Sequence, residues 1–91
     1  MAKMTEQERN MKKNMHNEII QNNLGDARFY ASNNFLIEDG PLNGLQMELN
    51  HKDFIDWSYV NEKADKVIRA MQDIKRCGEN IRASQKALGR L

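Results

Sequence analysis

Few residues in this chain have the side chains and the spacing that metal binding or catalysis requires. The two histidines, His16 and His51, lie far apart in the sequence. Protein metal sites need His, Cys or carboxylate ligands that come together at close spacing. Asp53 lies near His51 and near Asp56, but each pair supplies only part of a ligand set. We therefore expect no metal and no cofactor, and we assign both histidines to exposed or capping positions.

The single cysteine, Cys77, is also a poor candidate for a nucleophile. A reactive thiol needs a neighbouring His or a helix N-terminus that favours the thiolate. Lys75 and Arg76 precede Cys77, but the position falls in the middle of an expected helix and on its apolar side. We expect Cys77 to be a small buried hydrophobic residue.

The glycine-containing segment at residues 40–44, GPLNG, does not resemble a phosphate-binding loop. It lacks the spacing of such loops and no Lys-Ser/Thr pair follows it. The carboxylates of Glu38 and Asp39 stand next to a proline and are typical of a turn. Since no catalytic set is left, we predict that the protein is not an enzyme.

Size and composition make a self-sufficient core hard to build. The chain has 91 residues, of which 40% are hydrophobic and 30% are charged. A domain of this size buries only about 60–65% of the surface that its unfolded chain exposes, so it needs additional stabilisation. One cysteine cannot form a disulfide within the chain, and a metal is not expected. We predict that residues 1–91 form a single helical domain that associates with other chains.

The sequence gives no indication of secretion or membrane insertion. The first residues, MAKMTEQERNMKK, contain no apolar run, and no segment approaches the roughly 20 apolar residues of a membrane span. A lone cysteine suits a reducing compartment. We expect a cytoplasmic protein with no membrane partner.

The first helix is expected from about residue 6 to residue 36. Thr5 and Glu8 have the S/T-x-x-E spacing of a capping box, in which the hydroxyl accepts a hydrogen bond from a free helix amide. Apolar and small residues then recur at helical spacing: Met11, Met15, Ile19, Ile20, Leu24, Ala27, Ala31 and Phe35. The stripe favours one long helix, kinked at Gly25. Two shorter collinear helices are the alternative, because Gly25-Asp26 also suits a C-cap followed by a new N-cap.

The connection between the helices is expected at residues 38–50. The run EDGP at residues 38–41 ends the first helix, because proline lacks a backbone donor and disfavours helical geometry in the residue before it. Leu45, Met47 and Leu49 alternate with polar residues, as in a short strand. Because no partner strand is in sight, we predict an extended connection whose Leu and Met side chains cover the end of the helices.

The second helix is expected from about residue 52 to residue 88, with Phe54, Ile55 and Trp57 packing its first turns. Written as heptads, the first positions are Trp57, Ala64, Met71, Gly78 and Gln85, and the fourth positions are Val60, Val67, Ile74, Ile81 and Leu88. All the fourth positions are apolar over nearly five heptads, which indicates that this helix packs against another helix.

The width of the apolar stripe favours a bundle over a parallel two-stranded coiled coil. Ile68, Ala70 and Cys77 flank the stripe and broaden it, and the charged residues that flank it are all basic. We predict an all-α fold in which the two helices form a long antiparallel helical hairpin. Two hairpins are expected to self-associate into a four-helix-type bundle, with a dimer favoured. The predicted self-association seam is Trp57, Val60, Val67, Met71, Ile74 and Ile81.

Gly78 interrupts the seam, and a glycine inside a helix costs about 1 kcal/mol relative to alanine. Two interpretations are open. Gly78 is either a close helix crossing or hinge, or a sign that the ordered helix ends near Cys77 and a weaker helix follows.

The C-terminal part of the chain is basic, which raises nucleic-acid binding as an alternative function. Lys75, Arg82 and Lys86 share one sector of the expected helix and suit contacts with a phosphate backbone. The formal net charge of the chain is only +1, and no helix-turn-helix, zinc-finger or RNA-recognition pattern occurs. Nucleic-acid binding is therefore the second hypothesis.

The first hypothesis is a small, oligomeric, non-enzymatic helical protein that binds another protein. Six methionines, many asparagines and the lack of a catalytic set fit this class. An adaptor or an inhibitor is expected, of the kind found among viral, phage and plasmid accessory proteins. Tyr59 and Leu45 are predicted to contact the partner.

Overall fold

The computed structural model describes residues 3–51 and 53–91, and this part of the chain is built of helices without a strand. The elements are the helix α1 (Glu6–Ala31), the π-helical turn η1 (Ser32–Leu36), the helix α2 (Pro41–Leu49) and the helix α3 (Trp57–Gly89). The prediction of an all-α fold is confirmed.

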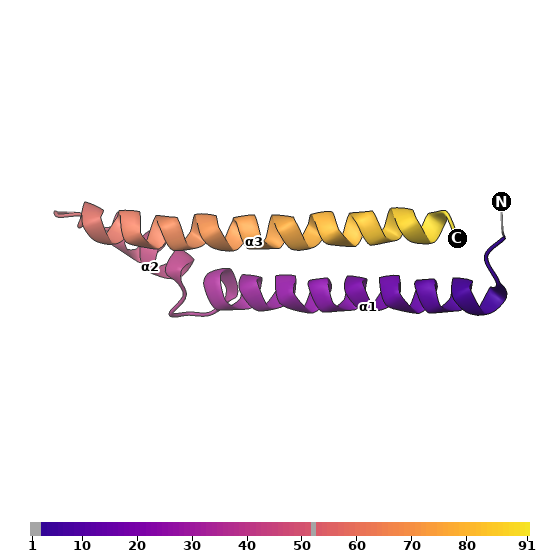
Figure 1. The fold of residues 1–91 in the computed structure, drawn as a ribbon. Helices are drawn as coiled ribbons and strands as arrows, with labels where there is room; N and C mark the ends of the chain where they lie inside the picture. Colours follow the sequence, from indigo (N-terminus) through magenta and orange to yellow (C-terminus); the bar gives the residue numbers. More distant parts are fainter. Residues whose placement is uncertain (1–2, 52) are drawn as a thin grey trace.

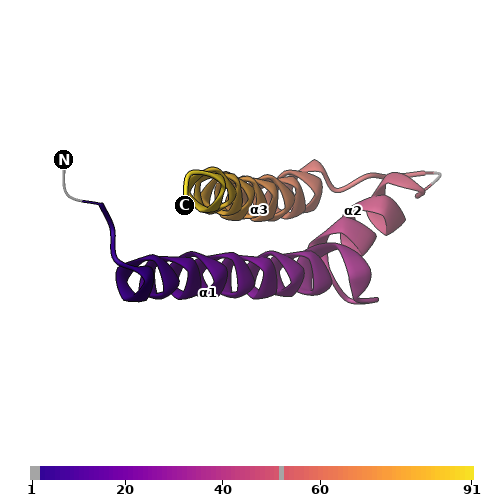
Figure 2. The ribbon, with the colours of Figure 1, turned by 90° about the vertical axis from the view of Figure 1, so that its right-hand side faces the viewer.

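The two long helices form an extended hairpin (Figure 1). α1 and α3 lie side by side and antiparallel, and α2 lies against the first turns of α3, beyond the end of α1 (Figures 1 and 2). The start of α1 and the end of α3 therefore share one end of the molecule. The principal extents are 71 × 22 × 14 Å, so the hairpin is long and thin.

α1 begins and continues as the sequence predicts. The Thr5 hydroxyl oxygen accepts a hydrogen bond from the Glu8 amide at 3.1 Å, which caps the helix. The helix passes through Gly25 without a break, so the alternative of two shorter helices is wrong. Its last turn widens into η1, and the helical segment ends at Leu36.

The connection is helical, so the prediction of an extended segment over residues 38–50 is wrong. α2 begins at Pro41, and proline is favoured at the first position of a helix because its missing donor would be unpaired there. Leu42 and Leu45 are three residues apart, share one face of α2 and are half-buried. Met47 and Leu49 are exposed. The alternation that resembled a strand is therefore coincidental.

α3 begins later than expected. Its N-cap is Asp56, whose carboxylate accepts a hydrogen bond from the Tyr59 amide at 3.2 Å. Lys52, the predicted first residue, lies outside the described residues, and the segment from Asp53 to Asp56 is not helical. Phe54 and Trp57 are exposed, so the prediction that they pack the first turns is wrong.

α3 is continuous through Gly78 and ends at Gly89. The interpretation in which the helix ends near Cys77 is therefore wrong. A Cβ atom at Gly78 would meet no other atom within 4 Å, so within one chain this residue is not a close crossing either.

The interior of the hairpin is thin. The buried residues of the described part of the chain are Gly40, which precedes α2, and Val60, Ala70, Cys77 and Ser84 of α3, and no large side chain is completely buried there. The radius of gyration is 19.9 Å, whereas a compact domain of this length has about 12 Å. One hairpin therefore leaves much of its apolar surface in contact with solvent.

Candidate interaction surface

α1 and α3 meet along a row of small side chains on α3. Ala70, Cys77 and Ser84 follow one another at intervals of seven residues, and each is only 4% exposed. Two side-chain hydrogen bonds cross the seam. His16 Nδ1 lies 3.3 Å from Ser84 Oγ, and Asn80 Nδ2 donates to Asn23 Oδ1 at 3.1 Å. These contacts fix the antiparallel register of the hairpin.

The structure divides the predicted self-association seam into two sets. Val60 is buried, and Val67, Ile74 and Ile81 are half-buried beside the small-residue row. Trp57 and Met71 are each 59% exposed. The fourth heptad positions thus pack inside the hairpin together with seventh positions such as Ala70. The first positions Trp57 and Met71 remain available to another molecule.

One flank of the seam is apolar near the middle of the rod. Successive residues of a helix are about 100° apart, so a residue that directly follows a seam position lies to one side of it. In an antiparallel pair, these following residues lie on the same flank of both helices. We call this flank the lateral face; its apolar residues are Leu24, Ala31 and Phe35 of α1 and η1 and Ile68, Met71 and Gly78 of α3. Ile68 and Met71 are exposed and the other four are half-buried. The exposed basic residues Arg28, Lys75 and Arg82 also follow seam positions and lie on the same flank.

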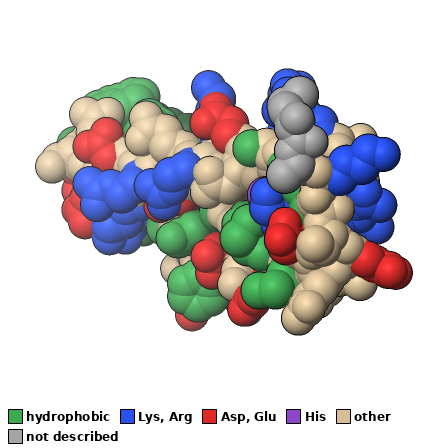
Figure 3. Space-filling model, turned by 45° about the vertical axis from the view of Figure 1, so that its right-hand side comes forward, with side chains coloured by type: hydrophobic (Ala, Val, Ile, Leu, Met, Phe, Trp, Pro, Cys, Tyr) green, Lys and Arg blue, Asp and Glu red, His purple; other side chains and the backbone are tan. Residues whose placement is uncertain are grey.

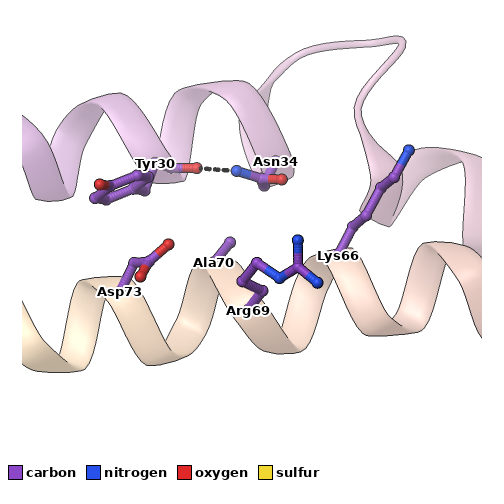
Figure 4. A pocket seen from close by; sticks show the side chains of 6 residues that line it. All are labelled: Tyr30, Asn34, Lys66, Arg69, Ala70 and Asp73. Atoms are coloured by element: carbon purple, nitrogen blue, oxygen red, sulfur yellow. Dashed lines mark hydrogen bonds between the residues drawn. The ribbon is translucent and has the colours of Figure 1, made fainter.

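The opposite flank is polar and holds an open pocket of about 220 Å³ between α1 and α3. It is lined by Tyr30, Asn34, Lys66, Arg69, Ala70 and Asp73 (Figure 4). The Asn34 amide donates to the Tyr30 carbonyl oxygen at 2.8 Å, and the Arg69 side chain reaches toward Asn34. Asp73 is paired with Arg76 at 3.1 Å. This flank offers hydrogen bonds and charges of both signs rather than an apolar contact surface.

A second apolar surface surrounds the turn end of the hairpin. Six of the eleven exposed large hydrophobic side chains of the described residues lie between Leu36 and Trp57. We call them the tip cluster: Leu36, Ile37, Met47, Leu49, Phe54 and Trp57. Phe54 is 76% exposed and Leu36 is 75% exposed, which are the highest values in the set. On the face that Figure 3 shows, charged side chains of both signs are mixed with hydrophobic side chains.

The two partner contacts expected from the sequence lie inside this end of the molecule. Leu45 and Tyr59 are both half-buried. The Tyr59 hydroxyl approaches the α2 backbone so closely that a Cβ atom at Gly44 would lie 2.6 Å from it. Lys63 Nζ lies 5.1 Å from the centre of the Tyr59 ring, a cation–π distance. The Tyr59 side chain therefore packs against α2.

Sequence reasoning missed most of the tip cluster as a surface. The available signal was the density of apolar residues on both sides of EDGP, which continues to Trp57. Periodicity assigned Phe54 and Trp57 to a helix interior. The observed start of α3 shows that Phe54 precedes this helix and that Trp57 is its first residue.

The basic residues of the alternative hypothesis lie together on α3. Lys75, Arg82 and Lys86 are exposed and share one side of the helix at intervals of seven and four residues. Arg82 and Lys86 line a shallow depression of about 310 Å³ together with Glu79 and Ala83. The carboxylate of Glu79 thus interrupts the positive surface.

The residues first considered for chemistry have structural positions. Cys77 is a free, buried thiol, as expected. The expectation that His16 is exposed or capping is wrong, because it is half-buried and shares a hydrogen bond with Ser84. His51 is exposed and lies 3.6 Å from a Glu48 carboxylate oxygen. In residues 3–51 and 53–91, no three His, Cys, Asp or Glu side chains come together in a way that could hold a metal ion.

No protein-family model matches the chain, and neither a curated protein nor a solved structure is significantly similar to it. None of the helices in the described part of the chain has the length and apolarity needed to cross a membrane.

Proposed function

We propose that this protein is a non-enzymatic interaction module that self-associates and binds another protein, as an adaptor or an inhibitor. The observation that carries the proposal is the concentration of exposed apolar side chains at the tip of the hairpin. Large contiguous apolar patches are unusual on monomeric soluble proteins and mark sites of interaction. Aromatic residues and methionine, which include Phe54, Trp57 and Met47 here, are enriched in the buried centres of interfaces.

The composition of the tip suits a protein partner. The apolar side chains are accompanied by the carboxylates of Glu38, Asp39, Glu48, Asp53 and Asp56. An apolar centre with a charged rim is the usual anatomy of a protein–protein interface. The same carboxylates repel a phosphate backbone, which makes the tip unsuitable for nucleic acid.

A site-specific photocrosslinking experiment tests this proposal. Phe54 is replaced by a photoreactive phenylalanine analogue, and Phe29 is replaced in the same way as a matched control. Phe29 is 63% exposed and lies on α1, outside the six residues of the tip cluster. In an extract of the source cells, the analogue at residue 54 is expected to give one main crosslinked protein. The double substitution Met47→Ser/Leu49→Ser is expected to abolish this product. The same products from both positions, or no product from either, would contradict the proposal.

Nucleic-acid binding by α3 remains the second candidate, because Lys75, Arg82 and Lys86 are exposed on one side of that helix. Each phosphate contact releases condensed counterions, so such binding weakens steeply as salt rises. Replacing the three residues with glutamine is expected to abolish any retardation of DNA or RNA in a gel without changing the fold. A sequence-selective shift at physiological ionic strength would favour this function over protein binding.

A further inference from the structure

The hairpin exposes more surface than a typical globular monomer of the same mass. Its solvent-accessible area is 7295 Å², whereas a globular monomer of 10.6 kDa has about 5,500 Å². The surplus of about 1,800 Å² per chain falls in the range that each subunit of an obligate dimer buries, about 1,000–2,500 Å². The missing contact is therefore of the size of a stable subunit interface.

The lateral face is the surface best suited to this contact. It lies along the middle of the rod, and its exposed centre is formed by Ile68 and Met71 of α3. Ala31 and Gly78 are small, so a second helix layer can approach closely at these positions. The opposite flank carries Lys66, Arg69 and Asp73 and the open pocket at the middle of the rod, and a second chain there would have to desolvate those charges. On the lateral face, Lys75 and Arg82 lie farther along α3, where charges of a second copy can pair with them.

The charge distribution along the rod determines the orientation of the second copy. Residues 37–56, at the tip, contain five acidic residues and one basic residue, which gives a net charge of −4. Residues 74–91, at the other end, contain five basic residues and one acidic residue, which gives +4. With the tips side by side, like charges would meet at both ends. With the rods reversed, the basic half of each α3 lies next to the acidic tip of the other copy.

We infer that the lateral face docks against the same face of a second copy of this chain, with the two rods antiparallel and the two tip clusters at opposite ends. The two-fold axis then lies in the plane of the contact near Ala70 and Met71, and α3 packs on the second α3. In this dimer the two hairpins stack as two layers, which together contain four long helices. The dimer presents two identical binding sites separated by the length of the rod. This inference deepens the self-association in the proposed function, and its test involves no tip partner, so the two can fail separately.

Measuring the mass of matched variants in solution tests whether the lateral face forms the contact between the two copies. Sedimentation equilibrium is expected to give about 21 kDa for the parent protein, twice the 10.6 kDa of the chain. The double substitution Ile68→Lys/Met71→Lys is expected to weaken dimerisation at least tenfold. Met11→Lys/Phe29→Lys, a control pair on the outer side of α1 with similar exposure, is expected to leave the mass at the dimer value.

A distance measurement tests the orientation without disturbing the face. A Cys77→Ala background is used, and Ala83, which is exposed, is replaced by a spin-labelled cysteine. A helix rises about 1.5 Å per residue, so the labels in the antiparallel dimer are expected roughly 40 Å apart. A dimer with its tips together would place them within about 25 Å.

Each outcome of these two experiments bears on a different part of the inference. A folded parent protein of 10.6 kDa at high concentration would overturn the inference. A dimer with short label distances would overturn the orientation, and a dimer that resists Ile68→Lys/Met71→Lys would overturn the face. If the lateral-face variant unfolds instead of dissociating, the label distance in the Ala83 variant still decides. Failure of Phe54 crosslinking would leave all these results unchanged.

Discussion

His16 Nδ1 lies 3.3 Å from Ser84 Oγ, although 68 residues separate these residues in the chain. Ser84 is buried, and this contact gives its hydroxyl a hydrogen-bonding partner. Together with the bond between Asn23 and Asn80, the pair fixes how α1 and α3 are aligned. A shift of one helix by a single turn would break both bonds. The small residues of the seam would tolerate such a shift, so these polar groups specify the register.

Removing one partner of this pair is expected to cost more than removing both. His16→Leu leaves the buried Ser84 hydroxyl unpaired, which should lower the free energy of unfolding by about 1–3 kcal/mol. His16→Leu combined with Ser84→Ala replaces both polar groups by apolar ones and should be nearly neutral. A double-mutant cycle followed by urea unfolding measures the coupling. Additive effects of the two substitutions would show that the hydrogen bond contributes nothing.

Gly44 and Tyr59 are expected to be energetically coupled. A methyl group at Gly44 would lie 2.6 Å from the Tyr59 hydroxyl oxygen but 3.6 Å from the ring carbon that carries it. In the Tyr59→Phe background, Gly44→Ala should stabilise α2 by about 0.5–1 kcal/mol, the usual difference in helix propensity. In the parent protein the same change should be destabilising, because the half-buried ring must move. Equal effects in both backgrounds would contradict the packing of α2 on α3.

Val67→Asp is expected to disrupt the hairpin. Val67 lies half-buried in the seam, where an unpaired carboxylate would cost several kcal/mol against a total stability of about 5–15 kcal/mol. Gln72→Asp is the control, since Gln72 is exposed on the same helix. Helical circular dichroism at 25 °C should be lost in the first variant and kept in the second. A Val67→Asp protein that melts like the parent would show that the seam is misassigned.

Periodicity predicted the long helices well and the turn end poorly. The cap at Thr5 and the fourth heptad positions of α3 depend on local spacing, so they could be read from the chain. The short helix α2 could not, because Leu45, Met47 and Leu49 fit a two-residue period as well as a helical one. Within one chain, Ala70 and Cys77 pack in the seam, whereas Trp57 and Met71 stay exposed. The sequence of α3 alone could not show this, because it depends on how α1 is aligned, and polar pairs such as Asn23 and Asn80 set that alignment.

Gly25 and Gly78 provide a comparison of a free helix surface with the lateral face. Within one chain, a Cβ atom at either residue would meet nothing within 4 Å. Gly25→Ala should therefore stabilise the protein by about 0.5–1 kcal/mol. Gly78→Ala should give a smaller gain or a loss, because in the dimer its methyl group enters the contact between copies. Equal gains in thermal unfolding would show that no second chain packs closely at Gly78.

The concentration dependence of thermal unfolding tests the central claim most directly. If folding of this thin hairpin requires a second copy, the melting temperature must rise with protein concentration, because mass action favours the associated folded state. We predict a continuous rise across a roughly hundredfold range of concentration, with loss of helical signal and of dimer mass in the same transition. A melting temperature that stays constant over that range, with a sedimenting mass of 10.6 kDa throughout, would contradict the account.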